Sequence, residues 1–293
     1  MSGAVLTVER AGALTTVQDL GRPGYAHLGV PASGALVRAA HLLANRLVGN
    51  PGAAAGLETT VNGCAVRASC PVVVAVTGAA CPVRVDGRPA AWGVPVRVPA
   101  GAVLDVGTAE RGVRAYVAFA GGLDVPAVLG SRATDLLSGL GPAPLSDGAR
   151  LPLGESRFGP PPYTGDVLPY GGIGAEVVLP LLPGPRADWF APGAVGALAR
   201  GRYTVSPASN RIGLRTLGPP VERLRHEELP SEGMVSGSVQ VPPDGRPVVF
   251  LADHPTTGGY PVIGVVPAAA LPAAAQAAPG TPLRFAPAVR TPR

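Results

Sequence analysis

The sequence predicts a mainly β protein of two lobes with few short helices. Runs rich in valine and leucine recur at short intervals, and glycine or proline bounds nearly all of them. The 293 residues include 41 glycines and 35 prolines, which punctuate these runs instead of forming the low-complexity blocks of disordered segments. Only one stretch has convincing helical periodicity. Regular short strands separated by turn signals are typical of barrels and sandwiches.

Eight runs are the clearest strand candidates, because each is short, rich in β-branched residues and closed by turn residues. Four lie in the first half of the chain and four in the second. They are residues 5–8, 72–77, 103–106, 113–119, 177–179, 203–206, 248–251 and 262–266.

The stretch GALVRAAHLLANRLVGN, residues 34–50, is the one convincing helix. Ser33 is its predicted N-cap and Gly49 its C-terminal stop. A second helix is predicted within residues 268–280, interrupted at Pro272. The residues that predict the buried face of the first helix, at spacings of three and four, are Leu36, Ala39, Ala40, Leu43 and Leu47.

Residues 158–172, FGPPPYTGDVLPYGG, are the predicted linker between the lobes. Three consecutive prolines and four glycines do not suit the interior of a strand or a helix. We therefore expect an N-terminal β-lobe at 1–157, with its helix near 35–48, and a C-terminal β-lobe at 173–293. Exchange of strands between the lobes is left open.

The composition excludes several classes of site. All 24 basic residues are arginine, so the chain has no Walker A lysine, no Schiff-base lysine and no lysine that could carry biotin. The net charge of +5 is spread thinly, which argues against a nucleic-acid interface. Three cysteines and four histidines are scattered, so no protein-built metal site is expected.

The same composition bears on where the protein works. The odd number of cysteines and the lack of a signal peptide favour the cytoplasm. No apolar run reaches the roughly 18 residues that a membrane-spanning helix needs, so no membrane association is expected.

Two polar stretches of the first lobe are candidate sites. Residues 15–34 hold Gln18, Asp19, Arg22 and Ser33 among glycines and prolines, which allow a tight loop. The alternative is a structural loop in which Asp19 and Arg22 pair with each other. Residues 120–135 hold Arg132, an arginine able to clamp a carboxylate or phosphate with two parallel hydrogen bonds. An internal arginine–aspartate pair explains Arg132 equally well.

Two further stretches belong to the second lobe. Ser209 and Arg211 lie in SPASNRIGLR, whose residues also suit a plain turn. Residues 228–240 alternate polar side chains with glycine and valine, as on a strand with one polar face. The turn PPDG, residues 242–245, predicts a hairpin that places Gln240 and Asp253 near the same end of neighbouring strands. Two threonines, two glycines and a tyrosine then form the predicted tip of a further hairpin, LADHPTTGGYPVIG, residues 251–264.

The four stretches together resemble a known family. The segments that carry the resemblance are TVQDLGRPGYAHLGVPASGA, ANRLVGNP, AGGLDVPAVLGSRATD, SNRIGLR, and GMVSGSVQVPPDG followed by LADHPTTGGYP. They are similar to the biotin-dependent carboxyltransferase, or allophanate hydrolase subunit 2, family, over residues 4–286. Val37 stands where relatives often carry an aspartate, and Pro255 stands where many carry a glutamine.

The resemblance implies two cyclophilin-like β-barrel lobes and a partner of the subunit 1 type. It also implies a function: the C subunit of an ATP-dependent 5-oxoprolinase, which opens 5-oxo-L-proline to L-glutamate together with A and B subunits. This chain is then expected to be inactive alone. The alternatives are a regulatory, KipA-like binding partner and the carboxyltransferase of a urea or allophanate-type enzyme. Carboxyl transfer would need biotin on another chain, because this one has no lysine.

ATP and Mg²⁺ are the cofactors that this function implies, and their binding could fall mainly to a partner subunit. Phosphoryl transfer needs charge neutralisation, which falls to Mg²⁺, to arginines or to the partner. Asp253, Arg22 and Arg132 are the predicted catalytic residues, with Asp253 holding a metal or orienting an arginine. The predicted substrate-binding residues are Gln18, Asp19, Ser33, Asn45, Ser209, Arg211, Ser231, Gln240, Thr256, Thr257, Gly258, Gly259 and Tyr260.

Overall fold

A computed structural model of the chain describes residues 3–155, 174–227 and 229–288. Its backbone contacts divide the chain into two compact units. The first comprises residues 1–22, 33–135 and 139–172, and the second comprises residues 23–32, 136–138 and 173–293. The predicted linker, 158–172, lies outside the described residues, so the predicted lobe boundaries stay a prediction.

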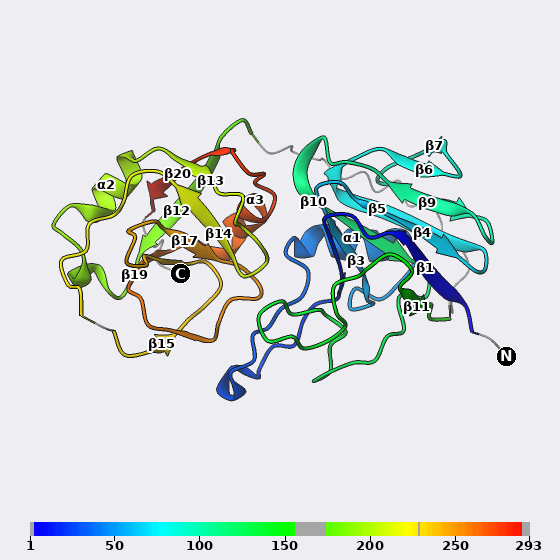
Figure 1. Cartoon of the computed structure of the whole chain (residues 1–293), viewed down its shortest axis with the longest axis horizontal. Helices are drawn as coiled ribbons and strands as arrows, with labels where there is room; N and C mark the ends of the chain where they lie inside the picture. Colours follow the sequence, from blue (N-terminus) through cyan, green and yellow to red (C-terminus); the bar gives the residue numbers. More distant parts are fainter. Residues whose placement is uncertain (1–2, 156–173, 228, 289–293) are drawn as a thin grey trace. The chain divides into compact units, whose positions relative to one another are not determined.

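The first unit is built from two antiparallel sheets (Figure 1). A six-stranded sheet has the order β11-β1-β4-β9-β6-β7, and a five-stranded sheet has the order β2-β3-β10-β5-β8. The strands are β1 (Val5–Arg10), β2 (Leu14–Gln18), β3 (Gly56–Thr60), β4 (Cys64–Ala68), β5 (Val72–Ala80), β6 (Val83–Val85), β7 (Arg88–Ala90), β8 (Val96–Val98), β9 (Val103–Val106), β10 (Arg111–Phe119) and β11 (Arg150–Pro152).

The apolar core of the first unit lies between these sheets, because one continuous cluster joins residues of both. Val17, Leu57, Val117 and Val76 stand in register across β2, β3, β10 and β5, and each is at most 2% exposed. Successive side chains of a strand point to opposite faces. The neighbours of these four residues therefore face away from the core, towards helix α1 (Arg38–Leu47), which packs on β5 and β10.

Helix α1 begins later than its sequence predicts. Ser33 is not the N-cap: it has a left-handed φ of 52°, and Val37 occupies the cap position without a side-chain hydrogen bond. Ala39 is exposed, so the predicted buried face was wrong at that position, whereas Ala40, Leu43 and Leu47 are buried. The predicted stop is confirmed, because Gly49 has a φ of 76° and donates to the carbonyl of Arg46.

The second unit contains a closed seven-stranded barrel of order β12-β19-β16-β17-β14-β13-β20 (Figure 1). Leu179, Leu214, Val239, Ile263 and Phe285 are at most 1% exposed and belong to its core. The barrel strands are β12 (Val177–Pro183), β13 (Tyr203–Val205), β14 (Gly213–Leu217), β16 (Ser238–Gln240), β17 (Val248–Phe250), β19 (Val262–Val265) and β20 (Pro282–Pro287), and β15 (Glu232–Gly233) pairs separately with β18 (Thr257–Gly258).

The mainly β prediction is confirmed, and each of the eight predicted strands is found. The second predicted helix is split into η3 (Ala268–Ala270) and α3 (Leu271–Ala275), and Pro272 lies in the first turn of α3, where no backbone N–H is needed. Three short helices carried no clear sequence signal: η1 (Ala26–Leu28), η2 (Ala187–Trp189) and α2 (Ala194–Arg200). Within the described ranges, no helix has the length and hydropathy that spanning a membrane requires.

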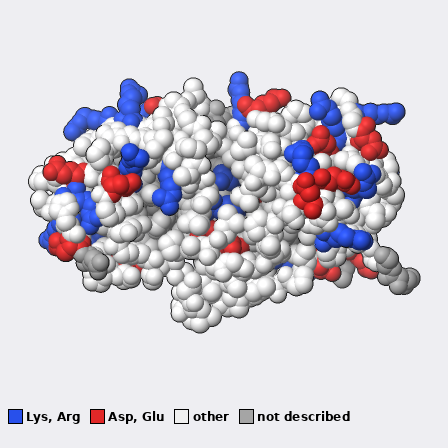
Figure 2. Space-filling model, in the orientation of Figure 1, with Lys and Arg blue, Asp and Glu red and all other residues white. Residues whose placement is uncertain are grey.

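Charged side chains of both signs are mixed on the face of the molecule drawn in Figure 2. The arginines there, in blue, lie among the acidic residues, in red. The described residues visible there form no large patch of a single sign. This distribution agrees with the thin spread of the +5 net charge that the sequence predicts.

One predicted hairpin exists and the other does not. PPDG closes a hairpin between β16 and β17, in which Gln240 pairs with Val248. Asp253, however, follows the opposite end of β17, so the expected proximity of Gln240 and Asp253 at one strand end was wrong. Residues 251–261 form no hairpin tip either, because β16 lies between β17 and β19 in the barrel. They form a loop that passes from one side of β16 to the other.

Two glycines of the second unit allow a test of how closely the backbone packs there. Gly237 and Gly280 both have left-handed φ values, 88° and 82°. A Cβ on Gly237 would lie 2.2 Å from the carbonyl oxygen of Val266, whereas a Cβ on Gly280 would meet nothing within 4 Å. We expect Gly280→Ala to cost about 1–2 kcal/mol of unfolding free energy, and Gly237→Ala to cost roughly 1–3 kcal/mol more. Urea denaturation measures both, and equal losses would contradict the close approach.

Candidate functional site

A row of polar side chains crosses the five-stranded sheet of the first unit on the face away from the apolar core. Thr16, Glu58, Tyr116 and Thr77 stand in register on β2, β3, β10 and β5, and each is at most 1% exposed. The Thr77 hydroxyl donates to the carbonyl of Ala40 in α1 at 2.8 Å. The row is therefore buried against the helix, where each polar atom needs a protein partner.

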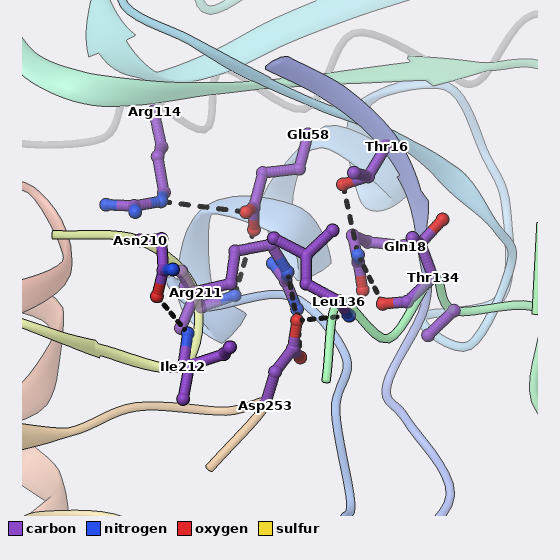
Figure 3. A network of polar contacts seen from close by, with 12 residues as sticks. Thr16, Gln18, Glu58, Arg114, Thr134, Leu136, Asn210, Arg211, Ile212 and Asp253 are labelled. Atoms are coloured by element: carbon purple, nitrogen blue, oxygen red, sulfur yellow. Dashed lines mark hydrogen bonds and ion pairs between the residues drawn. The ribbon is translucent and has the colours of Figure 1, made fainter. Parts of the chain in front are cut away.

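Glu58 is the charged member of this row. Its carboxylate accepts hydrogen bonds from the Leu36 backbone N–H at 3.0 Å and from the Tyr116 hydroxyl at 2.8 Å. The Arg114 Nε lies 3.6 Å from its other oxygen (Figure 3). Burial and the neighbouring Glu58 carboxylate raise the pKa of Tyr116 well above its ordinary value. The phenol consequently stays neutral and remains a donor to Glu58.

Gln18 lies two residues beyond Thr16, on the same face of β2. Its amide nitrogen donates to the Thr16 hydroxyl and to the Thr134 carbonyl, both at 3.0 Å (Figure 3). The Gln18 Oε1 and the Thr134 Oγ1 are buried but have no hydrogen-bond partner in the described part of the chain. This corner therefore has hydrogen-bonding capacity that the described protein atoms do not use.

Asp19 holds a distant segment in place. Its carboxylate accepts from the Ser131 hydroxyl at 2.6 Å, from the Arg132 backbone N–H at 2.7 Å and from the Gly21 backbone N–H at 2.7 Å. The predicted alternative, an internal pair of Asp19 with Arg22, was wrong: Asp19 binds backbone and hydroxyl donors instead.

The guanidinium group of Arg22 binds the same segment, residues 128–133. The side chain is 1% exposed and donates to the carbonyls of Val128, at 3.3 Å, and Ala133. No carboxylate of the described residues forms an ion pair with it, and its Nη1 is buried without a hydrogen-bond partner. A buried cation held only by neutral carbonyls is costly, so Arg22 keeps a charge that the fold alone does not explain.

Asn45 is fully buried in α1 and belongs to a polar chain with His41. Its Nδ2 lies 3.0 Å from the His41 Nε2 and donates to the Ala54 carbonyl at 2.9 Å, while its Oδ1 accepts from Asn50 at 2.9 Å. Burial lowers the pKa of His41, and the nearby Asp19 and Glu58 charges only partly oppose this effect. Asn45 is thus committed to internal contacts.

Arg132 forms the internal pair that its sequence context allowed. Its Nη2 donates to Asp124 at 2.7 Å and its Nε donates to the Val125 carbonyl at 2.7 Å. The side chains of Arg132 and Asp124 are 38% and 63% exposed, so the pair contributes little to stability.

In the second unit, Arg211 and Asp253 form a fully buried, two-pronged ion pair (Figure 3). The Nε to Oδ2 and Nη2 to Oδ1 distances are both 2.9 Å. Asp253 also accepts from the Leu136 backbone N–H at 3.1 Å. The pairing with Arg211 agrees with one of the two roles predicted for Asp253, the orientation of an arginine, and the catalytic role stays a prediction. Among the described residues, no group of three or more His, Cys, Asp or Glu side chains could hold a metal ion.

The threonine–glycine–tyrosine stretch is partly a short strand. Thr257 and Gly258 form β18, and neither Gly258 nor Gly259 has a left-handed φ, so the expected turn role for these glycines was wrong. The Gln240 amide donates to the Tyr260 carbonyl at 3.1 Å, and a Cβ on Gly258 would lie 2.8 Å from that amide nitrogen. Close packing, rather than conformation, explains Gly258. Thr257 and Tyr260 are exposed.

The remaining predicted site residues lie apart from these networks. The Ser209 hydroxyl accepts a hydrogen bond from the Arg215 N–H and donates one to the Arg215 carbonyl, as expected for a plain turn. Ser231 is exposed, and the backbone carbonyl of Thr256 accepts from Met234. The polar alternation around Ser231 does not form one strand, because it is divided between β15 and β16.

Sequence reasoning missed Glu58, Arg114, Tyr116, Thr77 and His41. A signal existed on β10, where Arg114 and Tyr116 alternate with apolar residues, whereas β3 and β5 show no such alternation. An exposed sheet face shows the same alternation, so the pattern alone does not reveal that this face is buried. Only helix α1, which covers the face, distinguishes the two cases.

The Arg211–Asp253 pair generates a stability prediction. Arg211→Met leaves a buried carboxylate without its cation, so we expect a loss of about 3–5 kcal/mol in unfolding free energy. Adding Asp253→Leu should recover part of this loss. Arg284→Met is the matched control, because Arg284 pairs with Glu176 at 2.9 Å with side chains 44% and 33% exposed, and it should cost at most about 1 kcal/mol. Equal losses for Arg211→Met and Arg284→Met in denaturant titrations would contradict the prediction.

His41 generates a pH prediction. Its pKa is lowered in the folded state, whereas in the unfolded chain it protonates near the ordinary value of 6.5. The unfolded state therefore binds more protons as the pH falls below about 6.5, and the free energy of unfolding decreases. His41→Gln should flatten this decrease, and His27→Gln, at an exposed position, should leave it unchanged. Unfolding curves between pH 5 and pH 8 make the comparison, and identical slopes in wild type and His41→Gln would refute it.

Comparisons with known proteins place these residues in a family context. The model of the family "carboxyltransferase domain, subdomain A and B" matches residues 28–287. The C subunit of the 5-oxoprolinase of Escherichia coli strain K12 is 38% identical over 287 residues, which cover 96% of this chain and 90% of that protein.

Two solved structures share the fold. The crystal structure of TTHA0988 matches with a TM-score of 0.87 and 36% identity, and this chain spans 56% of its length. The urea amidolyase of K. lactis matches with a TM-score of 0.88 and 30% identity, and this chain spans 19% of its length. The chain therefore belongs to the carboxyltransferase domain family, subdomains A and B.

Proposed function

We propose that this chain is the C subunit of an ATP-dependent 5-oxoprolinase, which opens 5-oxo-L-proline to L-glutamate with A and B subunits. The observation that carries the proposal is the extent of the similarity. The match to the C subunit of the E. coli 5-oxoprolinase covers 90% of that protein at 38% identity. The match to the K. lactis urea amidolyase covers 19% of a much longer chain.

The proposed reaction places requirements on this chain. ATP and Mg²⁺ would bring phosphate charge that arginines or a partner subunit must neutralise, because the chain has no lysine. Arg22 is the best candidate in the first unit, since its buried guanidinium has no acidic partner among the described residues. In the second unit, Asp253 would act by holding Arg211. All three cysteines are free thiols, which supports a reducing compartment such as the cytoplasm.

Carboxyl transfer is the second candidate, and the urea amidolyase match favours it. It would require biotin on another chain, because biotin is carried on lysine. The two functions differ in their partners: one requires the A and B subunits of a 5-oxoprolinase, and the other requires a biotin carboxylase and a biotin carrier.

Reconstitution tests the proposal. We expect the purified chain to be inactive alone and to support 5-oxoproline-dependent ATP hydrolysis when combined with A and B subunits. The readouts are phosphate and glutamate release. Robust turnover by the lone chain would overturn the subunit role. Urea-dependent turnover with a biotin carboxylase and biotin carrier, but none with the A and B subunits, would select carboxyl transfer. Assembly with A and B subunits that are equally active without this chain would indicate a regulatory partner.

A substitution of Thr257 separates a catalytic from a structural role of residues 256–260. The Thr257 side chain is exposed, so Thr257→Val should change the melting temperature little and reduce turnover of the assembled complex at least about tenfold if its hydroxyl binds substrate. Thr204→Val, in β13 of the same unit, is the control and should leave turnover unchanged. Unchanged turnover and KM in Thr257→Val would return these residues to a structural role.

A further inference from the structure

A cavity of about 270 Å³ opens in the first unit, apart from the buried polar row. Residues from the segments after α1 and after β10 line it. The polar and charged residues of the lining include Asn50, Asp124, Arg132 and Glu155. It therefore combines one cation and two carboxylates around a small space.

Internal contacts hold part of the cavity lining in place. Asn50 donates to the Phe119 carbonyl at 2.7 Å and accepts from the Gly121 N–H at 2.9 Å. Gly121 and Gly122 have left-handed φ values, and a Cβ on Gly121 would lie 2.2 Å from the carbonyl oxygen of Gly154. With the bond to Asn45, both N–H groups of the Asn50 amide are used internally, so Asn50 offers no donor to a ligand.

Arg132 offers a binding group for a ligand. Its Nε and Nη2 are held by Val125 and Asp124, and its backbone N–H is held by the buried Asp19. Its Nη1 donates no hydrogen bond to the described residues, and the side chain is 38% exposed. One edge of the guanidinium thus anchors the side chain, and the remaining N–H groups are free for a carboxylate. Because the anchored edge fixes the rotamer, little conformational entropy is lost on binding.

The carboxylates complement this arginine. Asp124 neutralises Arg132 in charge, and Glu155, which is exposed and forms no ion pair within the described ranges, leaves a net negative charge. A ligand with an anionic group alone would meet repulsion from Glu155, whereas an added ammonium group would be attracted.

The size of the cavity limits the ligand further. A volume of about 270 Å³ lies just below the range of roughly 300–1,000 Å³ in which drug-sized ligands bind, and it therefore suits a smaller ligand.

We propose that this cavity binds a free α-amino acid, with its carboxylate on the Arg132 Nη1 and its ammonium group beside Asp124 and Glu155. All residues of the site belong to the first unit. The proposal follows from their charges and hydrogen bonds, so it does not rest on the proposed 5-oxoprolinase function. If that function holds, the site distinguishes an amino-acid product from its lactam substrate, which has no ammonium group.

Titration of the full chain with matched small molecules, followed by backbone amide NMR, tests the proposal. Glycine should shift the amide signals of Gly121, Gly122 and Leu123. N-acetylglycine, which lacks the ammonium, and glycinamide, which lacks the carboxylate, should bind at least about tenfold more weakly. L-glutamate should likewise bind more tightly than 5-oxo-L-proline. Equal affinities for glycine and N-acetylglycine, or no shifts at these amides with any of the five compounds, would overturn the proposal.

Variants assign the affinity to the named groups. Arg132→Gln and Glu155→Gln should each weaken glycine binding at least about tenfold. Glu155 is exposed, so Glu155→Gln should leave the fold intact. Arg67→Gln is the matched control, because Arg67 pairs with Glu9 in the same unit at 2.6 Å and with similar exposure. Wild-type glycine affinity in folded Glu155→Gln, or an equal loss in Arg67→Gln, would count against the site.

Discussion

The carboxylate of Glu58, which is only 1% exposed, is the main electrostatic constraint on the first unit. Such a group is tolerated only where donors surround it, and the fold supplies them from separate segments of the chain. The Leu36 N–H comes from the approach to α1, the Tyr116 hydroxyl from β10, and the Arg114 guanidinium from the same strand. Through these contacts Glu58 connects β3 to β10 and to the segment that leads into α1.

In the second unit, a buried carboxylate is compensated by fewer groups. Arg211 and Asp253 are fully buried and meet through two hydrogen bonds, and Asp253 also accepts from Leu136. In both units the most buried charges are thereby held in one geometry. Arg22 differs, because its guanidinium is buried against carbonyls alone. Arg132 differs again, because part of its guanidinium faces a cavity. In both arginines the Nη1 donates no hydrogen bond to the described residues, which leaves capacity for a ligand.

Family membership and residue geometry answer different questions about function. The extent of the match to a 5-oxoprolinase subunit supports a role for the chain in a larger assembly. The geometry shows which side chains have no internal task that explains them. Asn45, Asp19 and Ser209 carry polar groups in motifs that suggested substrate binding, but their hydrogen bonds are internal. Thr257 and Tyr260, by contrast, are exposed.

What the sequence determined by itself was local: eight strands, helix α1 with its glycine stop, and the PPDG hairpin follow from side-chain periodicity and turn chemistry within a few residues. It also determined that no lysine chemistry is possible. Tertiary structure alone decided that Asp19 binds Ser131 and Arg132, that Glu58 meets Tyr116, and that Arg211 pairs with Asp253. It also decided that residues 251–261 pass around β16 instead of closing a hairpin. These contacts join residues 42 to 113 positions apart, and strand order, which no local pattern encodes, determines which of them come together.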